Sequence, residues 1–90
     1  AWSNKGAALL KFGKYEDALK ACSRSIEIDS NDGDAWFNRA CGYSLLKKKE
    51  DAFINLRKAI EIDSSNKEEA KKDEDFKFLW KDEDFKKLVN

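Results

Sequence analysis

The chain has 90 residues, enough for one small domain with a modest core, and its 18 basic residues equal its 18 acidic ones. This balance argues against a nucleic acid or an anionic membrane surface as partner, because such partners need a basic face. No apolar run approaches the roughly 18 residues that a transmembrane helix needs, and no signal-peptide pattern is present. Two cysteines without any histidine give no metal-binding spacing. We therefore expect reduced thiols, no metal, no cofactor and a cytoplasmic location.

Helical periodicity runs through the first two-thirds of the chain, and there is no proline to interrupt it. Apolar residues at three- and four-residue steps predict helices near residues 2–12, 15–28, 34–46 and 50–62. Turn-forming residues separate these helices at Gly13 and at residues 30–33, and three lysines occupy positions 47–49. We interpret the lysines as a solvated turn that favours the end of the preceding helix, rather than as a binding patch.

A second, shorter pattern follows. Asp-Glu-Asp-Phe-Lys stands at residues 73–77 and again at 82–86, each time followed by apolar residues at helical spacing. The pattern predicts two short amphipathic helices near residues 75–80 and 83–89, with acidic residues that cap the start of each helix. We expect these helices to cover an open edge of the core, as the terminal elements of repeat proteins do.

The first two-thirds of the chain is an internal repeat. Ile-Glu-Ile-Asp-Ser occurs at residues 26–30 and 60–64, while Trp2 and Asn4 recur 34 residues later as Trp36 and Asn38. A fixed period of this length indicates a stack of similar units, and such stacks usually provide binding surfaces. We divide the chain into two units, 1–32 and 33–66, and a C-terminal cap, 67–90.

The recurring residues resemble the tetratricopeptide repeat signature. The first unit matches it at Trp2, Gly6, Leu9, Tyr15, Ala18, Cys22, Ser25 and Ile26, and the second at Trp36, Ala40, Tyr43, Ala52, Leu56, Ala59 and Ile60. The resemblance implies an all-α fold, an antiparallel helix-pair superhelical solenoid whose helices approach closely at the small residues. Lys49 departs from the signature, because an aromatic residue is usual at that position. Residues 67–90 fit poorly as a third unit, since Glu74 would then be buried between helices.

The resemblance also implies protein or peptide binding without catalysis. In this family the first helix of each pair lines a concave groove, and the matching residues here are Asn4, Ala7, Lys11, Phe37, Asn38, Cys41 and Leu45. The two asparagines could hydrogen-bond the backbone of an extended peptide, or stay solvated, or bond the neighbouring helix. Phe37 is either an anchor in the groove or part of the packing against the cap.

Self-association and catalysis are the other two classes of function. Self-association is the alternative: the chain begins Ala-Trp, inside the first unit, so we expect a fragment of a longer protein with an exposed N-terminal edge. An enzyme is disfavoured, because the sequence has no histidine, no glycine-rich phosphate loop and no base near either cysteine. An environment that stabilises the Cys41 thiolate would be an argument for an enzyme.

Overall fold

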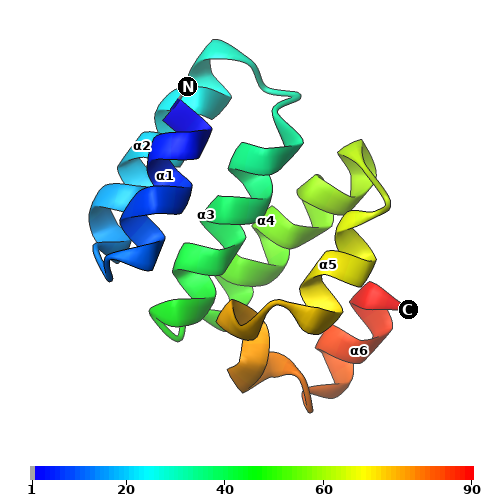
Figure 1. Cartoon of the computed structure of the whole chain (residues 1–90). Helices are drawn as coiled ribbons and strands as arrows, with labels where there is room; N and C mark the ends of the chain where they lie inside the picture. Colours follow the sequence, from blue (N-terminus) through cyan, green and yellow to red (C-terminus); the bar gives the residue numbers. More distant parts are fainter. Residues whose placement is uncertain (1) are drawn as a thin grey trace.

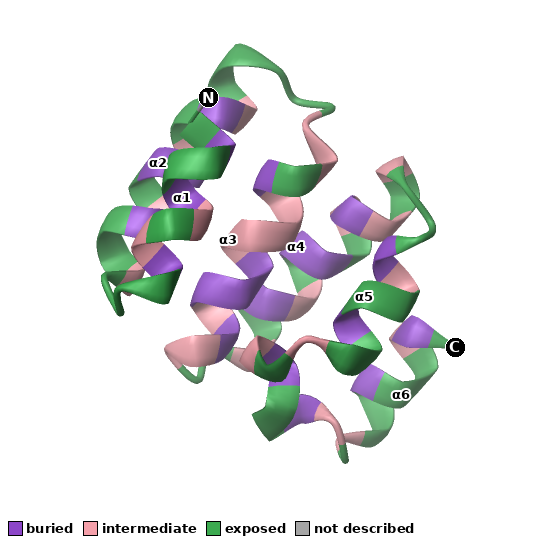
Figure 2. Ribbon diagram, viewed as in Figure 1, coloured by how far each residue is buried: buried purple, intermediate pink, exposed green. Residues whose placement is uncertain are grey.

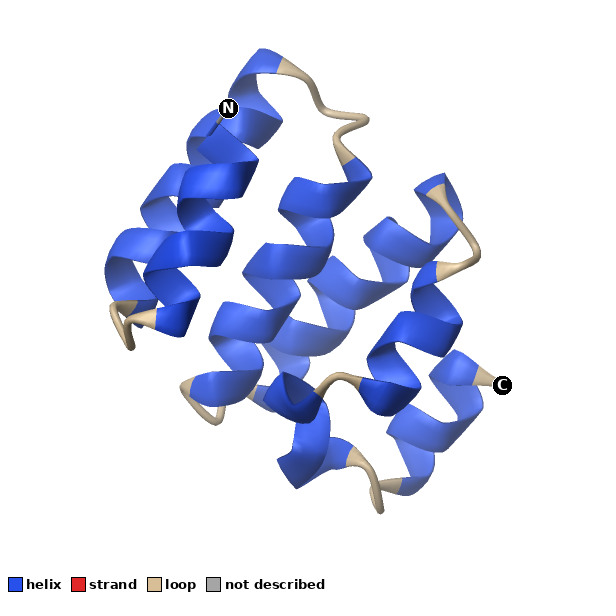
Figure 3. Cartoon of the chain, in the orientation of Figure 1, coloured by secondary structure: helices blue, strands red, loops and turns tan. Residues whose placement is uncertain are grey.

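The computed structural model describes residues 2–90, and over this range the chain is a series of helices and turns without strands (Figure 3). Four long helices come first: α1 (Trp2–Lys11), α2 (Tyr15–Ile28), α3 (Gly33–Leu45) and α4 (Lys49–Ile62). Each lies within one residue of its predicted range, and the all-α prediction is confirmed. Among these residues, no helix is both long and apolar enough to cross a membrane.

Three short helices form the C-terminal part: α5 (Asn66–Lys72), the 3-10 helix η1 (Glu74–Leu79) and α6 (Glu83–Val89). Helix α5 is not among the predicted helices. Helix α3 begins at Gly33, and one 34-residue period later is Lys67. Helix α5 begins one residue before that position, at Asn66. Helix α5 therefore occupies the place of the first helix of a third repeat unit, but it ends after 7 residues.

Carboxylates begin both of the last two helices, as predicted. Asp73 ends α5 in an extended conformation, and its side chain accepts a hydrogen bond from the backbone N–H of Asp75 (2.9 Å). Asp82 accepts from the backbone N–H groups of Asp84 (2.9 Å) and Phe85 (3.1 Å). Each carboxylate satisfies backbone donors that lack a partner within the helix, so each sets where the chain turns back.

Paired helices touch at small residues. A Cβ atom added to Gly6 of α1 would lie 2.6 Å from Cys22 Sγ of α2, a separation that real contacts do not reach. Ala18, Ala40 and Ala52, at the other close-approach positions, are buried. The close approach predicted from the repeat is confirmed. Helices α1 and α3 lie side by side on one face of the molecule (Figure 1).

The cap buries large apolar side chains against the second unit. Phe76, Leu79, Phe85 and Val89 are all buried, and they belong to the same core as Leu56 of α4. Figure 2 shows buried positions on α6 as well as on the long helices. The Phe76 ring lies 5.9 Å from the Phe85 ring, centroid to centroid. The cap therefore completes the core, instead of lying loosely against it.

Lys49, the departure from the signature, links the cap to α4. Its Nζ atom lies 2.6 Å from Asp82 Oδ2 and 3.5 Å from Asp84 Oδ2. The hydrogen bond from Lys49 lowers the pKa of Asp82, and the same bond raises the pKa of Lys49. The pair lies near the surface, so we expect it to fix the position of α6 more than to add stability.

Candidate functional site

The candidate site is a hollow between α1, α3 and the turn that joins α5 to η1. Its volume is about 180 Å³, and it is lined by Ala7, Leu10, Lys11, Asn38, Cys41, Asp73 and Asp75. Helix α3 supplies one wall because it packs against α1 on one side and against η1 on the other. The first helices of the two units and the cap thus form the hollow together.

Four of the predicted groove residues line this hollow: Ala7, Lys11, Asn38 and Cys41. Three others do not. Asn4 is exposed on α1, Phe37 is half-buried, and Leu45 is half-buried against the core. Whether any of them binds a partner stays a prediction.

Phe37 packs against the cap. Its ring meets the ring of Phe76 edge to face, with centroids 5.5 Å apart and an interplanar angle of 73°. This geometry is a favourable one for aromatic pairs. Of the two roles that the sequence left open for Phe37, the structure favours the packing role, because η1 covers this part of the groove.

Asn38 bonds the neighbouring helix. Its Nδ2 donates to the backbone carbonyl of Ser3 in α1, at 3.2 Å. A carboxamide has two N–H donors and one carbonyl acceptor, so one donor and the acceptor remain for a ligand. Of the alternatives for Asn38, the structure shows the hydrogen bond to the neighbouring helix. Part of the side chain remains free for another partner.

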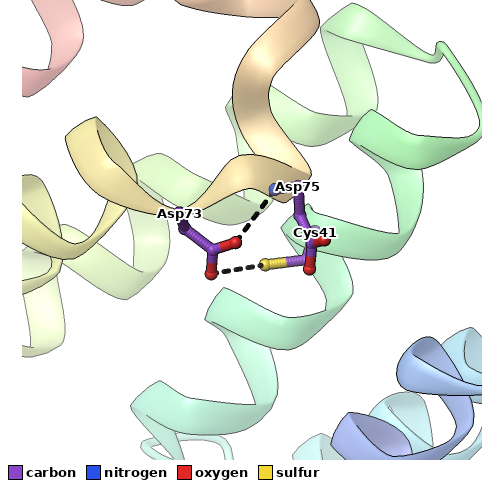
Figure 4. Close-up of side chains that lie close together, drawn as sticks. All are labelled: Cys41, Asp73 and Asp75. Carbon is purple, nitrogen blue, oxygen red and sulfur yellow. Dashed lines mark hydrogen bonds between the residues drawn. The ribbon is translucent and has the colours of Figure 1, made fainter.

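Cys41, Asp73 and Asp75 meet on one side of the hollow (Figure 4). Cys41 is 1% exposed, and its Sγ donates to Asp73 Oδ2 over 3.9 Å. The start of η1 is held in place by Ser44, whose Oγ donates to the backbone carbonyl of Asp75 (2.7 Å). Sequence reasoning missed the two carboxylates as site residues, because it assigned the Asp-Glu-Asp motif to helix capping alone. Nothing in the linear sequence places them beside Cys41.

Comparison with family models identifies the repeat. A tetratricopeptide repeat model matches residues 1–32, and a second model of the same repeat matches residues 33–66. The chain belongs to the tetratricopeptide repeat family. Tetratricopeptide repeats generally mediate protein–protein interaction and are typically non-catalytic scaffolds. A comparison with curated proteins gives no match.

Neither thiol of this tetratricopeptide repeat chain is activated. Burial raises the pKa of Cys41 well above its usual value, and the negative charges of Asp73 and Asp75 raise it further. Burial also raises the pKa of Cys22 to about 11, although Arg39 partly opposes the shift. An activated cysteine needs the opposite surroundings, with positive charge and a lowered pKa. The surroundings of Cys41 do not stabilise its thiolate, so they do not support a catalytic role for this cysteine.

Both cysteines are therefore expected to react slowly with 5,5′-dithiobis(2-nitrobenzoate) in the folded chain at pH 8. The raised pKa of Cys22, about 11 against a usual 9.0, leaves roughly 100-fold less thiolate at this pH. Since the group is an acid with a raised pKa, its reactivity should increase as the pH rises towards 11. Absorbance of the released thiol measures the rate, with urea-unfolded chain as the control. Equal rates in folded and unfolded chain would contradict the prediction.

Proposed function

We propose that this tetratricopeptide repeat chain binds an extended peptide or protein segment on the face formed by α1 and α3, where the cap leaves that face open. The observation that supports this proposal most directly is the hollow of about 180 Å³, which four of the predicted groove residues line. Its walls combine apolar Ala7 and Leu10 with basic Lys11 and acidic Asp73. Such a mixture of apolar surface and a few polar groups is typical of binding sites.

The two asparagines support the proposal in different ways. Asn4 is exposed on α1. Asn38 uses one N–H on Ser3 and keeps its carbonyl and second N–H. A peptide along this face would exchange backbone hydrogen bonds with both side chains, which gives affinity without dependence on sequence. Lys11 and Asp73 would then select among peptides by charge.

The test uses peptides selected from a phage-displayed library of random sequences. Each selected peptide is titrated by fluorescence anisotropy against a groove variant, Asn4→Ala with Asn38→Ala. Loss of two hydrogen bonds, each worth about 1 kcal/mol, is expected to weaken binding about tenfold or more. The matched control is Asn31→Ala with Asn90→Ala, at two exposed asparagines outside the hollow. Equal affinity of the groove variant and the control would reject the assignment of this face.

Self-association is a second candidate, and a separate hollow favours it. This hollow, of about 430 Å³, lies on the outer side of α1 and α2 and is lined by Trp2, Lys5, Leu9, Asp17, Lys20, Ala21 and Arg24. Trp2 is 41% exposed there, although Lys5 Nζ lies over its ring at 4.8 Å. Light scattering over a concentration series tests this candidate. A mass that rises with concentration and falls back in Trp2→Ala supports self-association, while a constant monomer mass rejects it.

A further inference from the structure

Three potential metal ligands of two chemical types converge beside the hollow. Cys41 comes from α3, Asp73 from the turn between α5 and η1, and Asp75 from the first turn of η1. Their Sγ and carboxylate oxygen atoms all lie within 4.8 Å of one another. The thiol is buried and both carboxylates are half-buried, so this group differs from the exposed acidic clusters that are common on protein surfaces.

The negative charge of the two carboxylates is not balanced by a nearby cation. Within residues 2–90, no lysine or arginine nitrogen lies within 4 Å of Asp73 or Asp75, although Lys11 lines the same hollow. Two half-buried carboxylates close together repel each other, and a bound cation would remove that cost.

We propose that Cys41, Asp73 and Asp75 bind one divalent cation of the zinc class. A sulfur ligand favours Zn²⁺ over Mg²⁺ or Ca²⁺, which prefer sites made of oxygen alone. In zinc sites the metal–sulfur distance is roughly 2.3 Å and the metal–oxygen distance roughly 2.0 Å. In tetrahedral geometry these distances place neighbouring sulfur and oxygen ligands about 3.5 Å apart. Cys41 Sγ and Asp73 Oδ2 are already 3.9 Å apart, so small side-chain rotations complete the set.

The surrounding contacts hold the ligands in position. Ser44 fixes the backbone of Asp75, and Asp73 is held by the N–H of Asp75 through its other oxygen, Oδ1. Three protein ligands leave the fourth position of a tetrahedral ion open. All three ligands line the hollow, whose volume of about 180 Å³ admits water or a ligand atom.

Binding exchanges a proton for the metal. The S–H bond of Cys41 breaks, its proton passes to the solvent, and the sulfur keeps the electron pair that forms the bond to the cation. The ion then joins α3 to the start of η1, so it fastens the cap to the second unit. This inference does not depend on peptide binding, because all three ligands belong to the chain itself.

The test titrates the reduced chain with CoCl₂ as the probe, followed by ZnCl₂. Thiolate-to-Co²⁺ charge-transfer absorption in the near ultraviolet is expected to saturate at one ion per chain, and Zn²⁺ should abolish it by displacing the Co²⁺. Cys41→Ser and Asp75→Asn should each weaken Co²⁺ binding more than about tenfold, as even indirect ligand changes do.

The chain offers a matched control for each variant. Cys22→Ser removes the other buried thiol, and Asp84→Asn changes the equivalent residue in the second Asp-Glu-Asp-Phe-Lys motif. Both controls should bind Co²⁺ as the original chain does. Absence of the thiolate band, or equal losses in a variant and its control, would overturn the proposal. Circular dichroism checks that each variant is folded, and if Cys41→Ser unfolds, the Asp75→Asn and Asp84→Asn pair decides.

Discussion

Replacing Phe76 with alanine is expected to lower the free energy of unfolding by about 3–5 kcal/mol, the cost of removing a buried aromatic side chain from a packed core. Phe76 has no exposed surface, and its ring packs against the rings of Phe37 in α3 and Phe85 in α6. A domain of this size is stabilised by only roughly 5–13 kcal/mol. One substitution in the cap should therefore remove a large fraction of the stability of the whole chain.

Urea denaturation followed by circular dichroism measures this loss. The control is Phe78→Ala, in the same 3-10 helix, because Phe78 is 43% exposed and lies under Lys47 Nζ at 4.6 Å from its ring. We expect a change within about 1 kcal/mol for this control. If both variants unfold at the same urea concentration, the cap does not complete the core in the way described.

The long helices could be predicted from the sequence because each has an apolar stripe with helical period, and because the stripe occurs twice. Helix α5 has no such stripe. Its sequence, Asn-Lys-Glu-Glu-Ala-Lys-Lys, contains one apolar residue, Ala70, and only Asn66 and Ala70 are buried. The period of the repeat predicts a helix there, although the composition alone does not. The C-terminal part therefore has three short helices where the apolar pattern predicts two.

The candidate site was predictable only on the side that the repeat itself supplies. Resemblance to the family places Ala7, Lys11, Asn38 and Cys41 on the first helices, and they do line one hollow. The other side depends on where the chain turns after α5, which Asp73 determines by ending one helix and starting the next. That turn directs η1 over Phe37 and brings two carboxylates to Cys41, and no periodic pattern in the sequence encodes such contacts.

Replacing Gly6 with valine is expected to destabilise the fold by about 3 kcal/mol, at the upper end of what extra carbon atoms cost in a packed interior. The first added atom would lie 2.6 Å from Cys22 Sγ and 3.4 Å from the carbonyl oxygen of Ala18. Cys22 is fully buried and cannot turn towards solvent, so α1 and α2 must separate. Valine forms helices slightly better than glycine, but that gain of a few tenths of a kcal/mol is much smaller than the clash.

The urea midpoint of Gly6→Val should be compared with that of Ala8→Val, which adds a similar branch on the exposed face of the same helix and should cost only about 0.6 kcal/mol. A second comparison isolates the contact itself. Gly6→Ala should lower the free energy of unfolding more in the original chain than in the Cys22→Ala variant, which lacks the sulfur atom. Substitutions at residues in contact are not additive. Additive effects of these two changes would mean that the helices do not meet at Gly6. A difference above about 0.5 kcal/mol would establish that the glycine sets the separation of α1 and α2 in the first unit.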